Sequence, residues 1–273
     1  MTYCLGIRVA EGLVCVTDGR LTAGAQVSAA RKASRHGRPG AEFHVMCSGL
    51  RSLRDRTLTY FDHWFGAAAK THEGELPDTG TPARLVEAVE QLSRCVKHII
   101  EDDRENLERS GLHADLHMIV AGQLGGDAEP GLYLIYPEGN WVSVDARLPY
   151  LAIGAVAYGK AVLDRTVQAD MPLRIALKAA YLAFESTRLA SADVGYPIDV
   201  LTFGRDRIWR EREFDHDDLL MLRRWWDKSL VALVETMPEA LWQEGLLPGP
   251  TWAPRAQEPI QLAASQEQTK RPK

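Results

Sequence analysis

Apolar residues follow two different periods along this chain, and the changes between them separate expected strands from expected helices. Two short runs rich in β-branched residues, 3–9 and 13–18, flank the turn Ala10-Glu11-Gly12 and predict a β-hairpin that begins at residue 2. Longer segments in which apolar residues recur every three or four positions predict helices. We expect further strands at 43–48, 113–122, 131–136, 141–145, 149–153, 198–203 and 207–211, helices at 50–70, 82–111, 158–168, 172–190, 219–233 and 238–244, and loops at 21–30, 37–40 and 71–81.

The order of these elements is strands, two helices, strands, two helices and strands again. Antiparallel strands that alternate with pairs of helices favour two stacked sheets covered by helices on both outer faces. The predicted fold class is therefore α+β, a four-layer αββα sandwich, over residues 2–212. A tryptophan-rich helical extension is expected at 213–247, and a disordered tail at 248–273, where Pro, Gln, Ala and Lys predominate.

The composition is that of a globular protein without a nucleic-acid or membrane partner. The chain has 273 residues, of which 45% are hydrophobic, and this is ample for a packed core. Its net charge of -5 gives no sign of nucleic-acid binding, and no apolar run approaches the roughly 18 residues that span a bilayer. No signal peptide precedes residue 2, so a cytoplasmic location is expected. No cofactor or metal is expected either, because metal-ligand spacing is lacking at Cys4, Cys15, Cys47 and Cys95.

Thr2 is the sharpest chemical candidate, because a strand is expected to begin there. If Met1 is removed, which a small second residue usually permits, Thr2 carries a hydroxyl and a free α-amine at the rigid end of a sheet. The reference pKa of an α-amine is about 7.7–8.0, so the amine can accept the hydroxyl proton near neutral pH. A threonine hydroxyl activated by its own amine is a known form of nucleophilic catalysis.

Several motifs accompany this residue: Thr2-Tyr3-Cys4-x-Gly6, the run from Asp18-Gly19-Arg20 to Gly24, Arg31-Lys32, and Tyr158-Gly159-Lys160-x-x-Leu163-Asp164-Arg165. With them, residues 2–205 resemble proteasome β-subunits, and more closely the bacterial proteasome-like families of the Anbu and β-proteobacterial proteasome homologue types. The resemblance implies the N-terminal-nucleophile hydrolase fold, self-assembly into stacked rings and hydrolysis of peptides or unfolded proteins by a threonine peptidase. It leaves open whether an ATP-dependent unfoldase feeds the ring.

The resemblance implies that Thr2 is the nucleophile and that Lys32 and Asp18 adjust its reactivity. A buried ammonium at Lys32 would favour the alkoxide of Thr2 and lower the pKa of the neighbouring amine. Asp18 would supply the counter-charge that a buried Lys32 requires; alternatively, Lys32 belongs to a basic surface patch and Asp18 to a turn. The backbone at Gly49, or at Ser48, would hold the oxyanion. The substrate pocket would be built from Leu21, Ala30, Lys32 and Met46.

Two features depart from the proteasome pattern. Proteasome β-subunits carry Gly-Ser-Gly near the nucleophile, with that serine bonded to the terminal amine, whereas this chain has Gly154-Ala155-Val156. The turn after the long helix also differs, and there Ser191 or Asp193 could bond the amine of Thr2. The lost hydroxyl favours a second hypothesis, a catalytically weak or inactive scaffold subunit of a ring. A third hypothesis is an unassembled small-molecule amidase.

Other residues are candidates for metal binding or catalysis, but each also has a structural explanation. His113, Asp115 and His117 alternate along a predicted strand, which is compatible with a metal site, although a polar strand face is the commoner cause. Cys4 would point to the same side of its strand as the proposed nucleophile, but no base is near it in the sequence. Glu185, inside a predicted helix, is expected to face solvent or a subunit interface.

Overall fold

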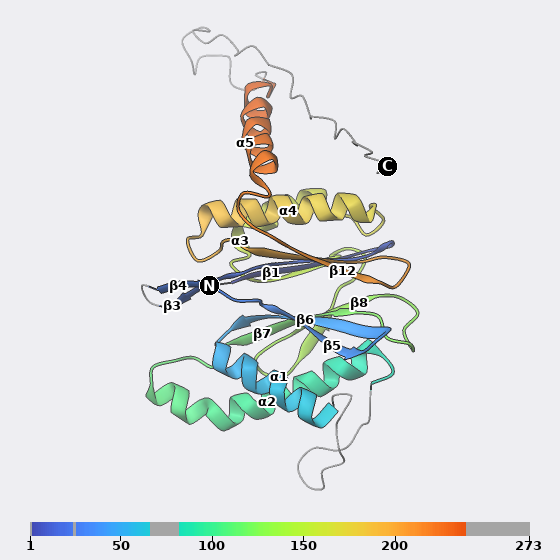
Figure 1. The fold of residues 1–273 in the computed structure, drawn as a ribbon, viewed down its shortest axis with the longest axis vertical. Coiled ribbons are helices and arrows are strands. Elements are labelled where there is room, and N and C mark those ends of the chain that lie inside the picture. Colours follow the sequence, from blue (N-terminus) through green and yellow to red (C-terminus); the bar gives the residue numbers. More distant parts are fainter. Residues whose placement is uncertain (1, 24–25, 66–81, 239–273) are drawn as a thin grey trace, which may run out of the picture. The chain divides into compact units, whose positions relative to one another are not determined.

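The computed structural model describes residues 2–23, 26–65 and 82–238 (Figure 1). The chain divides into two compact units, Met1–Asp217 and Asp218–Lys273. Every strand of the described chain belongs to the first unit, so the candidate chemistry of the sequence is positioned by that unit alone.

The first unit contains two five-stranded sheets, and both are antiparallel throughout. Their strand orders are β10-β1-β2-β11-β12 and β5-β6-β7-β8-β9. The hairpin predicted at the start of the chain lies at the centre of the first sheet, because its two strands pair with each other and with β10 and β11. The strands are β1 (Tyr3–Val9), β2 (Gly12–Asp18), β3 (Arg20–Ala23), β4 (Gln26–Ala29), β5 (Ala33–Arg38), β6 (Ala41–Gly49), β7 (Leu116–Gly122), β8 (Gly131–Ile135), β9 (Trp141–Ser143), β10 (Tyr150–Gly154), β11 (Ile198–Phe203) and β12 (Trp209–Phe214).

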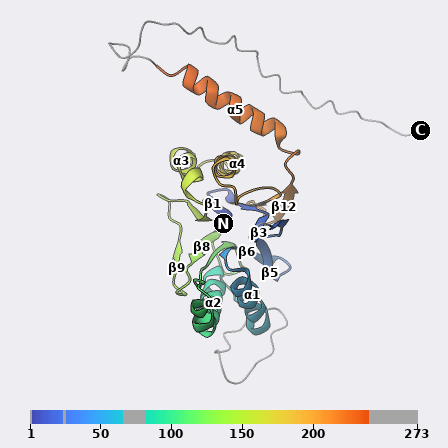
Figure 2. The same ribbon diagram turned by 90° about the vertical axis from the view of Figure 1, so that its left-hand side faces the viewer.

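Two pairs of helices cover the outer faces of the stacked sheets (Figures 1 and 2). α3 (Ala157–Thr166) and α4 (Leu173–Ala190) lie on the first sheet, whereas α1 (Arg51–Phe65) and α2 (Leu85–Arg109) lie on the second. The four layers confirm the predicted αββα sandwich. The apolar stripe predicted for α2 is its buried face, made of Leu85, Val89, Leu92, Val96, Ile99 and Ile100.

Alternate residues of β1 point into different layers, and this fixes where the start of the chain faces. Tyr3 packs toward α4, with its ring centroid 6.5 Å from that of Phe184. Cys4 belongs to the apolar cluster between the two sheets. The sheets approach closely there, because a Cβ on Gly6 would lie 2.6 Å from Leu132 Cδ1. Since Thr2 has the same parity as Cys4, it stands at the end of the strand on the side that faces the second sheet.

The structure differs from the predicted elements where strands are short and exposed. Residues 21–30 were expected to be a loop, but β3 and β4 form a two-stranded hairpin there. β5 was not predicted at all; it is an edge strand that pairs only with β6. All four residues of β4 are exposed, and β5 buries only His36. Neither strand therefore shows the alternation of apolar and polar residues by which a half-buried strand is recognised.

Glu185 does not face solvent, contrary to the expectation from the sequence. It is only 4% exposed, within α4. The hydroxyl of Tyr196 donates a hydrogen bond of 2.5 Å to its carboxylate, and the guanidinium of Arg188 forms an ion pair with it at 2.8 Å. Glu185 is buried because these partners compensate its charge, so its role is structural.

The second unit contains the helix α5 (Leu220–Glu235), in the region where a tryptophan-rich helix was predicted. The predicted loop at 71–81 and the tail at 248–273 lie outside the described residues, as does the predicted helix at 238–244 beyond its first residue. Of the helices in the described ranges, none combines the length and the apolar character needed to cross a membrane.

Candidate functional site

Thr2 lies just before β1 begins and is held in place by its own carbonyl oxygen and by the N–H of the next residue. Its carbonyl oxygen accepts a hydrogen bond of 2.7 Å from the N–H of Ala155, and the N–H of Tyr3 donates one of 2.8 Å to Asp18 Oδ1. The approach to Ala155 depends on Gly154, which has a φ of 86° and where a Cβ would lie 1.8 Å from the Thr2 oxygen. Glycine is thus required at residue 154 if Thr2 is to keep its place.

Lys32 and Asp18 form a buried ion pair beside Thr2, and the surface-patch alternative for Lys32 is ruled out. Lys32 Nζ lies 2.6 Å from Asp18 Oδ1 and 2.7 Å from the carbonyl oxygen of Arg20, and the side chain of Lys32 is 5% exposed. Burial raises the pKa of the Asp18 carboxyl, and the ammonium of Lys32 and the N–H of Tyr3 limit that rise. An ammonium has three donors, so one remains for a group that enters from the side of Thr2.

The segment that carries Lys32 is held by both layers. Arg31 donates to Asp199 on β11 from Nε at 3.1 Å, and Asp199 is almost completely buried. From the other side, Arg54 Nη1 on α1 donates to the carbonyl oxygen of Arg31 at 3.3 Å. The carbonyl oxygen of Lys32 itself accepts a hydrogen bond of 3.1 Å from the N–H of Cys47 on β6. These contacts determine the direction from which Lys32 reaches Asp18.

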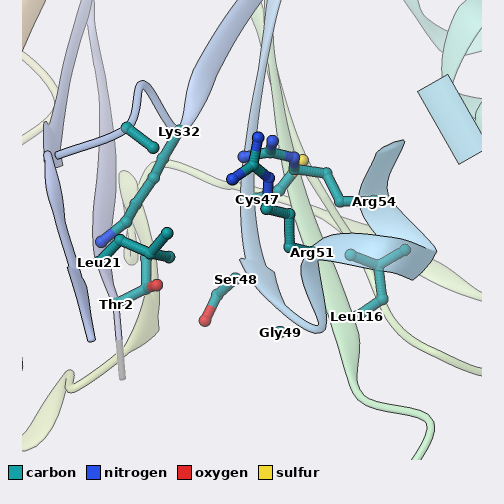
Figure 3. Close-up of a pocket in the computed structure, with 10 residues that line it drawn as sticks. Thr2, Leu21, Lys32, Cys47, Ser48, Gly49, Arg51, Arg54 and Leu116 are labelled. Atoms are coloured by element: carbon teal, nitrogen blue, oxygen red, sulfur yellow. The ribbon is translucent and has the colours of Figure 1, made fainter. Parts of the chain in front are cut away.

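A pocket opens at this point, between the start of the first sheet and the turn that joins β6 to α1 (Figure 3). The pocket is open to solvent, and the cavity itself has a volume of about 30 Å³. In the close-up, Thr2 and Lys32 lie on one side of the pocket and Ser48 faces them (Figure 3). Its described lining consists of Thr2, Leu21, Ala30, Lys32, Cys47, Ser48, Gly49, Arg51, Arg54 and Leu116. Leu21, Ala30 and Lys32 lie where the sequence placed them, but Cys47 takes the place of Met46, which is buried between the sheets.

Gly49 and Ser48, the two candidates for the oxyanion site, lie at the end of β6 opposite Thr2. Gly49 has a φ of 127°, and a Cβ there would lie 2.1 Å from the carbonyl oxygen of Asp115. Ser48 is paired across the sheet with His117, whose Nδ1 lies 2.9 Å from Asp115 Oδ1. Both residues line the pocket, so their position is compatible with the predicted oxyanion site, which stays a prediction.

The remaining candidates are distributed around this pocket rather than in it. Ser191 is buried at the end of α4, and Asp193 is half-buried in the turn that follows. The segment that joins this turn to β11 reaches the end of β2, because the carbonyl oxygen of Pro197 accepts a 2.6 Å hydrogen bond from the N–H of Gly19. Cys4 is fully buried, and burial raises the pKa of its thiol well above the usual value, which disfavours a nucleophilic thiolate.

The metal alternative at residues 113–117 is not supported by the described chain. β7 begins at Leu116, so His113 and Asp115 precede the strand instead of alternating along it. No group of three or more His, Cys, Asp or Glu side chains suited to a metal occurs among the described residues. Asp115 and His117 pair with each other instead.

Two arginines of the pocket were missed by sequence reasoning. Arg51 and Arg54 lie three positions apart at the start of α1, so they share one face of the helix, and both line the pocket. The signal that could have identified them is their place two and five positions after Gly49, the residue proposed for the oxyanion site. What the sequence lacked was the direction in which α1 leaves that turn.

Comparison with solved structures identifies proteins that share this architecture. An Anbu protein from Pseudomonas aeruginosa, solved as a helical assembly, is 27% identical, with a TM-score of 0.76 over 86% of this chain and 97% of that chain. A Gly-1 mutant of Anbu from Hyphomicrobium sp. strain MC1 has the same identity and TM-score over 88% and 99%. Anbu from Yersinia bercovieri, described as an ancestral beta-subunit, is 25% identical, with a TM-score of 0.73 over 87% and 98%. No protein-family model and no curated protein matches the sequence.

Proposed function

We propose that this Anbu-type, proteasome-like protein is a threonine peptidase in which Thr2, exposed by removal of Met1, cleaves peptide bonds. The observation that carries the proposal is the buried pair of Lys32 and Asp18, 2.6 Å apart, beside Thr2, which directly precedes β1. Burying two charges is costly, and a packed core alone gives no reason for an ammonium at that place. Because Thr2 and Lys32 line the same pocket, the buried pair lies where it can act on the hydroxyl of Thr2.

The chemistry follows from the order of groups around the pocket. The hydroxyl of Thr2 attacks the substrate carbonyl, while its proton passes to the α-amine of the same residue. The ammonium of Lys32 stabilises the developing alkoxide, and the backbone at Gly49 or Ser48 receives the negative charge on the carbonyl oxygen. Collapse of the intermediate releases the amine product and leaves an ester on Thr2. Water hydrolyses that ester to a carboxylic acid and restores the hydroxyl.

The terminal amine also requires orientation. The serine hydroxyl that serves this purpose in proteasomes is replaced by Ala155, whose N–H holds the carbonyl of Thr2. Ser191 and Asp193 remain the proposed substitutes, because the segment that follows them contacts the end of β2 through the hydrogen bond of Gly19 with Pro197. In this proposal they act on the amine and do not touch the substrate.

Self-assembly into a homo-oligomeric ring or double ring is part of the proposal. Such an assembly would enclose the pocket and restrict substrates to peptides and unfolded proteins. The structural neighbour from Pseudomonas aeruginosa forms a helical assembly, which supports assembly of this chain in some closed or open form. Mass photometry of the purified protein tests this point: a particle with the mass of one subunit would exclude a ring and favour the unassembled amidase.

A specific observation favours one alternative, a scaffold subunit with little or no activity. Ala155 offers no hydroxyl to the amine of Thr2, and it is nearly buried, with 7% exposure. An enzyme without this partner would lose part of the proton transfer on which the attack depends. Assembly without peptidase activity is the result that this alternative predicts.

The deciding experiment combines intact mass with peptide cleavage. We expect the native protein to lack Met1 and to hydrolyse fluorogenic peptides, and we expect Thr2→Ala to lower kcat/KM at least 100-fold, since the nucleophile is absent. Thr59→Ala is the matched control: Thr59 is exposed on α1, its hydroxyl bonds only to the preceding turn at Asp55, and its loss should leave cleavage unchanged. Retained Met1, or equal cleavage by the native protein and Thr2→Ala, would refute the mechanism.

A further inference from the structure

The pocket beside Thr2 has a strongly biased charge. Three cationic side chains line it, Lys32, Arg51 and Arg54, and none of its described lining residues is acidic. Lys32 is already compensated by Asp18, and both arginines share the carboxylate of Asp55 behind the pocket. Three positive charges thus face two negative ones, which leaves the entrance cationic.

The two arginines differ in how much of their hydrogen-bonding capacity is used. Arg54 is 19% exposed and donates to Asp55 Oδ1 from Nε at 2.8 Å and from Nη2 at 2.6 Å, while its Nη1 donates to Arg31. Arg51 is 60% exposed, and its described contact with Asp55 is a single one, from Nε at 3.3 Å. The terminal nitrogens of Arg51 therefore keep four N–H donors for a group in the pocket.

Both side chains extend from α1 on the side of the pocket opposite Thr2 and Lys32 (Figure 3). A peptide whose scissile carbonyl lies at Thr2 would place the side chain of its preceding residue in the space between them. A carboxylate there can accept hydrogen bonds from the terminal nitrogens of Arg51 and is attracted by the positive charge of Arg54. The N-terminal end of α1, whose first turn contains no acidic residue, also favours a negative charge. A lysine or arginine in the same place would meet only like charge.

We propose that the pocket selects substrates with Glu or Asp before the scissile bond. In this proposal Arg51 binds the carboxylate, and Arg54, whose position is fixed by its own hydrogen bonds, contributes a second positive charge. This inference rests on the proposed peptidase function for the position of the substrate. The specificity itself comes from the charges of this chain's own pocket, since a planar guanidinium recognises a carboxylate through two parallel hydrogen bonds.

The test uses four fluorogenic peptides that differ only in the residue before the cleaved bond, which is Glu, Gln, Leu or Arg. The assembled native protein should show a kcat/KM at least tenfold higher for Glu than for its neutral isostere Gln. Arg51→Gln should reduce that ratio to below threefold, and Arg51→Glu should turn the preference toward the Arg peptide. Raising the salt from 50 to 500 mM should shrink the native ratio, because exposed charges are screened.

Arg94→Gln serves as the control for loss of one positive charge. Arg94 is exposed on α2, does not line the pocket and should leave the ratio unchanged. Equal rates on the Glu and Gln peptides in the native protein would overturn the inference, as would an unchanged ratio in Arg51→Gln.

A binding measurement separates failure of this inference from failure of the peptidase proposal. Thr2→Ala should bind a labelled peptide amide ending in Glu at least fivefold more tightly than the same peptide ending in Gln, as measured by fluorescence anisotropy. If the native protein cleaves nothing but this difference is found and disappears in Thr2→Ala/Arg51→Gln, the pocket assignment stands and the peptidase assignment falls. Thr2-dependent cleavage without a difference in binding or rate leads to the reverse conclusion, and absence of binding by both peptides also overturns the pocket assignment.

Discussion

Removing the ammonium from the buried pair is the perturbation whose consequences the structure defines most closely. Lys32→Met keeps the apolar stem of the side chain and deletes its charge, while Asp18 stays fully buried and keeps its backbone contacts with Tyr3 and Gly195. Breaking a buried ion pair by removing one partner costs about 3–5 kcal/mol, because the other charge is left uncompensated. We expect a loss of about 3 kcal/mol in the free energy of unfolding at pH 8.

The loss should depend on pH in a defined direction. Burial already raises the pKa of Asp18, and without the ammonium only the backbone N–H groups of Tyr3 and Gly195 oppose that rise. A carboxyl whose folded pKa is above its unfolded value destabilises the fold as the pH rises through that range, by up to about 1.4 kcal/mol per pH unit. The deficit of Lys32→Met relative to the native protein should therefore be smaller at pH 5 than at pH 8.

The assay is urea unfolding followed by tryptophan fluorescence, at one fixed protein concentration because assembly contributes to apparent stability. Asp18→Asn added to Lys32→Met should recover part of the lost stability and remove its pH dependence. Lys160→Met is the surface control, since Lys160 pairs with Asp164 in an exposed helical position and its loss should change little. A deficit below about 1 kcal/mol at pH 8, or one of equal size at both pH values, would refute the account of a buried, mutually compensated pair.

Burial lowers the pKa of His44 to about 4. Because an unfolded imidazole titrates near pH 6.5, the fold should lose about 2 kcal/mol between pH 7.5 and pH 5.0 from this group, a slope that His44→Gln removes and the exposed control His113→Gln retains in urea unfolding. Gly154→Ala should lower peptide cleavage more than tenfold, because its Cβ would overlap the carbonyl oxygen of Thr2, whereas Gly111→Ala, with a positive φ but open space around it, should leave cleavage intact. If stability falls as steeply with acid in His44→Gln as in the native protein, the effect assigned to the burial of His44 is wrong. Full cleavage by Gly154→Ala would contradict the predicted overlap with Thr2.

The core strands and long helices of the fold could be predicted from the sequence, because their buried faces require apolar residues at regular spacings along the chain. β11 lies at 198–203 as predicted, and the stripe of α2 repeats every three or four residues because one face of that helix is buried. The same holds for the start of the chain, where β1 and β2 carry apolar residues on both faces since helices cover one side and a second sheet the other. Family motifs added Thr2, Asp18 and Lys32 as candidates.

Other features depend on partners far away in the sequence and could not be predicted locally. Glu185 resembles any helical acid until Tyr196 is placed beside it. β5 becomes a strand because β6 supplies its hydrogen bonds, and its own side chains give no sign of this.

The chemical character of the site was decided by tertiary structure. The sequence determined that a threonine opens the first strand and that a lysine follows thirty residues later. Only the fold brings Lys32 within 2.6 Å of Asp18 and turns α1 so that Arg51 and Arg54 line the same pocket as Thr2. Electrostatic effects depend on distance and burial, and neither quantity is a property of a sequence position until the layers have packed.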